Sequence, residues 1–181
     1  ADFWLQLENL PLERVAEKKR ILKERLISWI KKRLVQYIDR GTERPEYAEI
    51  LARLDENTLI ITHAKRMAPY KRADILFEDA DRLAEIINRS PVPILFIYAG
   101  KAHPSDGLGQ EALQRISRWS KDPRFRGSVL VLEDYDLSYA RRLLSGSDMW
   151  LNTPLRPLEA SGTSGMKGAI NGTLHFSVAD G

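Results

Sequence analysis

Ile94-Leu95-Phe96-Ile97-Tyr98-Ala99 is an uninterrupted apolar and aromatic run that ends at Gly100. Successive side chains of a strand point to opposite faces, so this run predicts a strand buried on both faces, as in parallel sheets. Similar short runs lie on either side of it along the chain: Thr58–His63, Ser128–Leu132, Met149–Leu151 and Thr173–Val178. Helical patterns separate them: Lys71–Asn88, Gln110–Ser120, Leu137–Leu144 and Thr163–Asn171. The alternation predicts an α/β fold, a Rossmann-like doubly wound parallel sheet of about five strands.

The N-terminal third has a different pattern. Apolar residues recur at helical spacing from Leu12 to Ile38, with Lys and Arg on the other face, which predicts one long amphipathic helix. Gly41 and Pro45 indicate a break, and a second helix is expected from Pro45 to Leu54. We therefore expect residues 1–56 to form a helical segment that packs on a domain of residues 57–181.

Composition excludes several classes of protein. The 28 Lys and Arg against 25 Asp and Glu give a net charge of +3, too small for a nucleic-acid interface on charge alone. With no cysteine, disulfides, thiolate catalysis and zinc-thiolate sites are excluded. No apolar run approaches the roughly 20 residues of a membrane span, and Ala1–Trp4 does not begin a signal peptide, so a cytoplasmic setting is expected. The acids around Tyr135 lack a His at ligand spacing, so no metal site is expected.

Ligands of doubly wound sheets bind beyond the carboxyl ends of the strands, so the loops there are the candidate sites. After the first strand, Lys65, Arg66, Lys71 and Arg72 put four cations into eight residues with no acid among them. With a helix expected to start at Lys71, this loop would suit a phosphate. Solvated surface cations remain the alternative.

The loop from Glu159 to Lys167 is rich in Gly and hydroxyl residues and leads into a helix, which a closely approaching phosphate requires. Lys167 lies four residues beyond Thr163, so both share a helix face, about 6 Å apart along the axis. That separation matches a cofactor with a phosphate at one end and a lysine-reactive carbonyl at the other. An ordinary Gly/Ser-rich helix start is the alternative. In the third loop, Asp136 or Ser138 is expected to cap the next helix, with Tyr135 projecting into the cleft.

Five blocks of residues, in order along roughly residues 58–181, resemble the C-terminal domain of the α-glucan (glycogen, starch and maltodextrin) phosphorylases. The segment Glu159–Lys167 is similar to the pyridoxal-phosphate signature of that family. Ile170 departs mildly, because the family usually has Leu or Met there. The blocks are Ile61–Arg72, Ala99–Pro104, Leu132–Tyr135, Trp150–Pro154, and Glu159–Lys167 with Asn171.

The resemblance implies a GT-B glycosyltransferase architecture and reversible phosphorolysis, in which inorganic phosphate cleaves a terminal α-1,4 glucosyl unit to glucose 1-phosphate. It implies pyridoxal 5′-phosphate as cofactor, attached to Lys167 as a Schiff base, with the cofactor's phosphate taking part in catalysis. The implied catalytic residues are Arg66 and Lys71, which hold the substrate phosphate, and Lys167. The implied cofactor-binding residues are Lys65, Tyr135, Gly162, Thr163, Ser164 and Lys167, and the implied glucosyl-binding residues are Glu159 and Ser161.

The resemblance also implies a missing part. Family members are several times longer, and their N-terminal catalytic domain supplies the glucan-binding wall and contacts to the cofactor. We therefore expect residues 57–181 to be an incomplete cofactor- and phosphate-binding domain, inactive alone, from a parent enzyme that is a homo-oligomer. Its partners would be α-1,4-glucan, inorganic phosphate and glucose 1-phosphate, not nucleic acid or a membrane. The alternatives are a nucleotide-sugar-dependent GT-B glycosyltransferase and a non-catalytic domain that binds a phosphorylated ligand.

Overall fold

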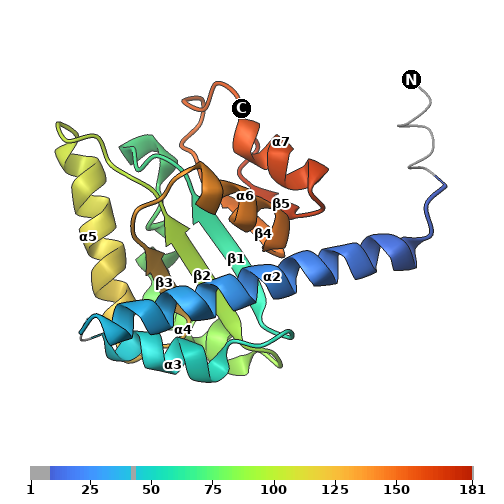
Figure 1. The fold of residues 1–181 in the computed structure, drawn as a ribbon. Coiled ribbons are helices and arrows are strands. Elements are labelled where there is room, and N and C mark those ends of the chain that lie inside the picture. Colours follow the sequence, from blue (N-terminus) through green and yellow to red (C-terminus); the bar gives the residue numbers. More distant parts are fainter. Residues whose placement is uncertain (1–8, 42–43, 181) are drawn as a thin grey trace.

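A computed structural model of the chain describes residues 9–41 and 44–180 (Figure 1). The expectation for Ala1–Trp4, and the parts of the helical segment at residues 1–8 and 42–43, lie outside the described residues. The strands form one sheet in the order β3-β2-β1-β4-β5, and every neighbouring pair is parallel. The strands are β1 (Leu59–Ala64), β2 (Ile94–Ala99), β3 (Val129–Leu132), β4 (Met149–Asn152) and β5 (Leu174–Ser177). The predicted α/β fold with a parallel sheet is confirmed.

Helices cover both faces of the sheet. The side chains of β2 alternate between the two faces of the sheet. Leu95 and Ile97 pack against the helices at residues 12–39, 45–53 and 137–146, whereas Phe96 and Tyr98 pack against the helical segments at residues 75–89 and 107–121. This division explains why the run that predicted the strand is apolar at every position. The helices are α2 (Leu12–Asp39), α3 (Pro45–Arg53), α4 (Ala80–Arg89), α5 (Gly107–Lys121), α6 (Leu137–Gly146) and α7 (Thr163–Ile170).

One predicted helix is wrong at its start. The α-helix expected from Lys71 begins only at Ala80, where the Asp79 carboxylate accepts a hydrogen bond from the Arg82 amide at 3.1 Å. Two short 3-10 turns precede it, η1 (Pro69–Lys71) and η2 (Ile75–Asp79). Arg72, at the end of η1, has a φ of 43°, and a left-handed residue cannot continue a right-handed helix. The cations after β1 therefore do not lie at the start of a long helix.

The order of the strands locates the ligand crevice. The chain builds outward from β1 through β2 to β3, then crosses back so that β4 pairs with the other side of β1. The connections leave β1 and β4 in opposite directions, which makes their carboxyl ends the topological switch point of the sheet. Candidate site residues are therefore expected in the loops after Ala64 and Asn152.

The long helix α2 crosses the face of the sheet that α6 also covers (Figure 1). Its Lys23 ammonium lies 2.9 Å from Asp148 Oδ2, and that same oxygen accepts the Ile60 amide of β1 at 2.8 Å. A side chain at Gly146 would place its Cβ 2.5 Å from Leu26 Cβ, so glycine lets α6 pack closely on α2. None of the described helices is long and apolar enough to span a membrane.

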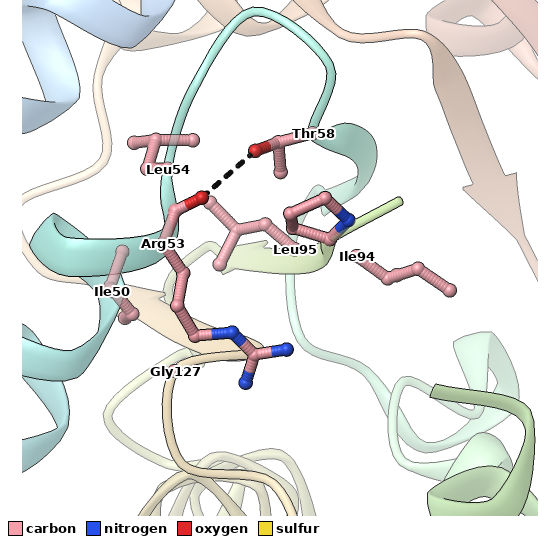
Figure 2. A pocket seen from close by; sticks show the side chains of 8 residues that line it. Ile50, Arg53, Leu54, Thr58, Ile94, Leu95 and Gly127 are labelled. Atoms are coloured by element: carbon pink, nitrogen blue, oxygen red, sulfur yellow. Dashed lines mark hydrogen bonds between the residues drawn. The ribbon is translucent and has the colours of Figure 1, made fainter. Parts of the chain in front are cut away.

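The amino-terminal edge of the sheet differs in chemistry from the carboxyl edge. There, α3 meets the starts of β1 and β2 around a mainly apolar hollow that includes Ile50 and Leu95, and the Thr58 hydroxyl donates to the Arg53 carbonyl at 3.4 Å (Figure 2). The surrounding side chains leave no room for even a water-sized group. This hollow is a packing junction rather than a ligand site.

Candidate active site at the carboxyl edge of the sheet

A polar cavity of about 280 Å³ lies at the switch point between β1 and β4. Its size is close to the lower limit of small-molecule pockets, roughly 300 Å³, so it suits a phosphate-sized group better than a complete substrate. Of the residues expected at the site, all but Tyr135 and Lys167 line it. The lining residues are Lys65, Arg66, Tyr70, Lys71, Asn152, Glu159, Ser161, Gly162, Thr163 and Ser164.

Lys65 is the buried cation of the cavity, with 8% of its surface exposed. Its ammonium donates to the Asn152 side-chain oxygen, so the residue after β1 is held by the last residue of β4. Burial is the main cause that lowers the pKa of Lys65 to about 8, the positive charge of Lys71 lowers it further, and Glu159 opposes the shift. Lys65 is therefore a cation at neutral pH that loses its charge under mildly alkaline conditions.

Lys71 and Glu159 form an ion pair across the cavity, with 2.6 Å between Nζ and Oε2. Both side chains are nearly buried, with 13% and 10% exposed. The Lys71 ammonium also lies 4.7 Å from the centre of the Tyr70 ring, within the range of a cation–π contact. Arg66, by contrast, is exposed and makes no hydrogen bond or ion pair with any residue in the described ranges. Its guanidinium is available to an anion in the cavity.

Arg72 does not line the cavity with Lys65, Arg66 and Lys71, contrary to the expectation of four cations there. Its guanidinium donates to the carbonyls of Thr153 and Pro154 at 2.9 and 3.0 Å, and the Thr153 hydroxyl donates back to the carbonyls of Lys71 and Arg72. The loop after β1 is thereby fastened to the loop after β4. The left-handed backbone of Arg72 and these contacts make it a structural residue of the site.

Gly100 permits the close approach of β2 to the Lys65 backbone. A Cβ at position 100 would lie 2.0 Å from the Lys65 carbonyl oxygen, a distance that atoms cannot share. The amide of Lys65 donates to the Ala99 carbonyl, and the amide of Met67 to the Lys101 carbonyl. The glycine therefore keeps Lys65 and Met67, in the loop after β1, in register with Ala99 and Lys101.

The helix α7 points its amino-terminal end at the cavity. Gly162 occupies the N-cap position, and no side chain caps the helix, which leaves the partial positive charge of the helix start accessible to an anion. The Trp150 indole donates to the Ser164 hydroxyl at 3.2 Å and joins α7 to β4. The Asp180 carboxylate accepts the Glu159 amide at 3.0 Å, which fixes the segment before the helix.

Two expected site residues lie outside the cavity lining. Lys167 is one turn further along α7 than Thr163, and its side chain is exposed. Tyr135 is half-buried behind the loop, its hydroxyl 3.5 Å from the Ala64 carbonyl, and burial raises its pKa. The expected cap of the preceding helix is confirmed at Asp136, whose carboxylate accepts the Tyr139 amide at 2.9 Å.

Sequence reasoning missed Asn152 and Tyr70 as members of the site. Asn152 is the last residue of a buried strand at the ligand edge, and that position was a signal that could have identified it. Its contact with Lys65 spans 87 residues and has no local signature. Tyr70 lies between cations in the loop after β1, and only the cations of that loop were predicted to belong to the site.

The cavity presents the kinds of donor that bind phosphate in proteins. It combines a buried ammonium at Lys65, an exposed guanidinium at Arg66 and an uncapped helix start at Gly162, the three kinds of donor that proteins use for phosphate. Among the described residues, no group of three His, Asp or Glu side chains is arranged to hold a metal ion.

The sequence model of the carbohydrate phosphorylase family matches residues 4–181. The chain belongs to the carbohydrate phosphorylase family. Family membership confirms the resemblance inferred from the five sequence blocks. It also places the cavity in a family whose named activity uses phosphate on carbohydrate.

Curated relatives agree with this membership. The chain is 43% identical over 179 residues to the maltodextrin phosphorylase of Thermococcus litoralis and 44% identical over 180 residues to the glycogen phosphorylase of Aquifex aeolicus. Both alignments cover 98% of this chain but 21% and 26% of those proteins, respectively. A glycogen phosphorylase of Mycobacterium tuberculosis is 42% identical over 161 residues, 88% of this chain and 19% of its own length. The chain thus spans about a fifth to a quarter of these family members.

Proposed function

We propose that this chain is the pyridoxal-phosphate- and phosphate-binding part of an α-glucan phosphorylase. The observation that carries the proposal is the convergence of Lys65, Arg66 and Lys71 with the uncapped start of α7 in one cavity. The names of its relatives support glycogen or maltodextrin as the glucan. The whole enzyme would release glucose 1-phosphate from the end of an α-1,4-glucan.

The cavity supports a division of roles among its residues. Lys65, with Gly162, Thr163 and Ser164, would hold the cofactor phosphate. Arg66 and Lys71, further out along the same loop, would hold inorganic phosphate. Glu159 and Ser161 would hydrogen-bond the glucosyl unit, Tyr135 would lie beside the cofactor, and Lys167 would attach it.

Charge balance explains why the site needs this many donors. Two phosphate groups repel each other strongly when they are close in a partly desolvated cavity, and nearby cations offset that repulsion. When bound, pyridoxal phosphate supplies a second phosphate that can hold or release a proton next to the substrate phosphate. Lys65 can stabilise one anion from the buried side of the cavity. Lys71 would be shared between Glu159 and an incoming phosphate. Phosphate binding would therefore compete with the Lys71–Glu159 ion pair and free Glu159 for the sugar.

The remaining parts of the proposal concern the parent protein. Residues 57–181 would form the cofactor-binding domain and residues 1–56 a helical segment packed on it through α2. The rest of the parent enzyme would supply the second wall of the cleft and the glucan-binding surface. The 181 residues alone would then bind phosphate without turning over glucan.

The test uses the full-length protein that contains this chain. With maltodextrin and inorganic phosphate it should release glucose 1-phosphate, and borohydride should fix pyridoxal phosphate covalently to it, except in Lys167→Ala. Arg66→Ala should weaken the use of phosphate while the cofactor stays attached. Arg118→Ala is the matched control, because Arg118 is also exposed but lies on α5, outside the cavity. A full-length protein that binds no cofactor and releases no glucose 1-phosphate would overturn the proposal.

A further inference from the structure

Asn152 is a buried amide at the end of β4, and 3% of its surface is exposed. Its side-chain oxygen accepts a hydrogen bond from the Lys65 ammonium. Its side-chain nitrogen donates to the Ser177 hydroxyl of β5 at 2.9 Å. The amide therefore connects the buried cation of the cavity to the next strand of the sheet.

The hydrogen bonds of this connection run in one direction. The Ser177 hydroxyl donates its hydrogen to the Val178 carbonyl at 2.6 Å, which leaves the hydroxyl oxygen to accept the Asn152 nitrogen. An ammonium can only donate, so Asn152 must present its oxygen to Lys65. Ser177 thus holds the amide in the one orientation that Lys65 can use.

The uncharged partner leaves the charge of Lys65 available to a ligand. Lys71 is paired with a carboxylate, that of Glu159, whereas the hydrogen-bond partner of Lys65 is a neutral amide. The Lys65 ammonium has three N–H groups and makes no other hydrogen bond within the described ranges, so two of them can reach an anion in the cavity that it lines. A carboxylate at position 152 would hold the ammonium as firmly but would offset its attraction for an anion.

Resting on the function proposed above, we propose that Asn152 and Ser177 are positioning residues of the phosphate site. Ser177 orients the Asn152 amide, and the amide places the Lys65 ammonium at the cavity without neutralising it. Both residues act through Lys65. The ligand that this arrangement serves is a phosphate group or another small oxyanion.

The other titratable groups around Lys65 stay the same when this connection is altered. Lys71 and Glu159 act on Lys65 from the loop after β1 and the segment before α7. Burial, followed by the charge of Lys65, lowers the pKa of His63 on β1 and of His175 on β5. Both imidazoles are therefore uncharged at neutral pH, so the pH dependence of anion binding just above neutrality reports on Lys65.

The experiment titrates sulfate calorimetrically into the full-length protein, freed of any bound cofactor, at a series of pH values. Sulfate has the shape and charge of the phosphate dianion and does not itself titrate in this range. Wild-type affinity should fall as the pH rises through about 8. Asn152→Asp should weaken binding at pH 7 about tenfold and yet raise the midpoint of the profile by about one pH unit or more, because a carboxylate both offsets and stabilises the Lys65 charge. Asn152→Leu should also weaken binding but lower the midpoint, since the ammonium loses its acceptor.

Variants of Ser177 test the second half of the connection. Ser177→Ala should weaken sulfate binding about threefold because it releases the amide, and Ser177→Thr, which keeps the hydroxyl, should restore the affinity. Thr62→Val is the matched control, because it removes a buried hydrogen bond of 2.7 Å between β1 and Ser147, just before β4. It should lower the thermal midpoint and leave both the affinity and the pH profile unchanged.

An unshifted midpoint in Asn152→Asp would overturn the role of Asn152, and wild-type affinity in Ser177→Ala would overturn that of Ser177. If Asn152→Leu does not fold, the nearly isosteric Asn152→Asp gives the decision. A full-length protein that shows these shifts with sulfate but takes up no pyridoxal phosphate would contradict the proposed function and leave both positioning roles standing.

Discussion

The Lys71 ammonium lies 2.6 Å from a carboxylate oxygen of Glu159 and joins the loop after β1 to the segment before α7. The two residues are 88 positions apart, and the contact joins the cation proposed to bind phosphate to the acid proposed to bind the sugar. The coupling energy of this ion pair can be measured. It also determines how much free energy an incoming phosphate must supply to displace the carboxylate.

A double-mutant cycle with Lys71→Met and Glu159→Gln should give a coupling energy of about 1 kcal/mol or more, because both side chains are largely shielded from water. The free energy of unfolding from urea titrations provides the measurement. The exposed Arg89–Glu85 pair, 2.6 Å long, is the control and should couple by about 0.5 kcal/mol or less. Equal coupling in the two pairs would contradict a shielded contact.

Lys65→Met should change how stability depends on pH. Burial lowers the pKa of Lys65 to about 8 from its ordinary value of 10.5, so folding at pH 7 confines a charge that the unfolded chain solvates better. The free-energy cost of burying the Lys65 charge is present in full below pH 8 and disappears as the pH rises to 10.5. The stability of the variant relative to wild type should therefore fall across that window, by up to about 1.4 kcal/mol per pH unit.

Phosphate affinity supplies the second readout of the same change. Wild-type affinity should decrease as the pH rises through about 8, because Lys65 then loses its charge. Lys65→Met should bind phosphate weakly at every pH and show a flatter profile. Lys121→Met, which replaces an exposed lysine at the end of α5, should match wild type in both measurements.

Gly100→Ala should both destabilise the fold and disturb the site. The new Cβ would lie 2.0 Å from the Lys65 carbonyl oxygen, and that backbone atom cannot move aside without shifting the loop after β1 that carries Lys65, Arg66 and Lys71. We expect a loss of about 2 kcal/mol or more in unfolding free energy and weaker phosphate binding. Gly107→Ala is the control, because a Cβ there meets no atom within 4 Å at the start of α5, and it should be neutral or slightly stabilising.

Asp148→Ala should loosen α2 from the sheet. The carboxylate accepts the Ile60 amide at 2.8 Å and pairs with the Lys23 ammonium at 2.9 Å, so its removal leaves two partly buried donors without an acceptor. We expect a loss of about 2 kcal/mol in unfolding free energy, and faster hydrogen exchange along α2. Asp81→Ala removes an acid that is 93% exposed and should cost less than about 0.5 kcal/mol. Unchanged exchange in α2 would show that this contact does not hold the helix.

The sequence predicted the sheet well because each strand carries its own local pattern. The run from Ile94 to Ala99 is apolar on both faces, and the fold places one core on each face. The start of α4 was missed because helical spacing continues through residues 71–79, while the left-handed backbone of Arg72 is imposed by contacts to Thr153 and Pro154. No local pattern encodes a contact 81 residues away.

The site was predictable to the extent that it follows strand ends. Placing candidates after β1 and before α7 brought eight of the expected residues into one cavity, since parallel strands end at the same edge. Pairings across the cavity were not predictable, because Lys65 with Asn152 and Lys71 with Glu159 depend on the chain crossing from β3 back to β4. The prediction that Arg72 faces the cavity with the other cations was wrong for the same reason, because its partners Thr153 and Pro154 follow β4.

That crossover has a consequence for how the protein is made. Six register pairs join β1 to β2, but two join β1 to β4, so the β1–β2–β3 half can pair before the other half has left the ribosome. Until residues 152 and 159 emerge, Lys65 and Lys71 lack both counterparts that hold them in the finished molecule. The cavity is therefore completed only after β4 and residue 159 have followed β1–β3 off the ribosome, and a nascent chain stalled before β4 would present Lys65 and Lys71 without Asn152 and Glu159.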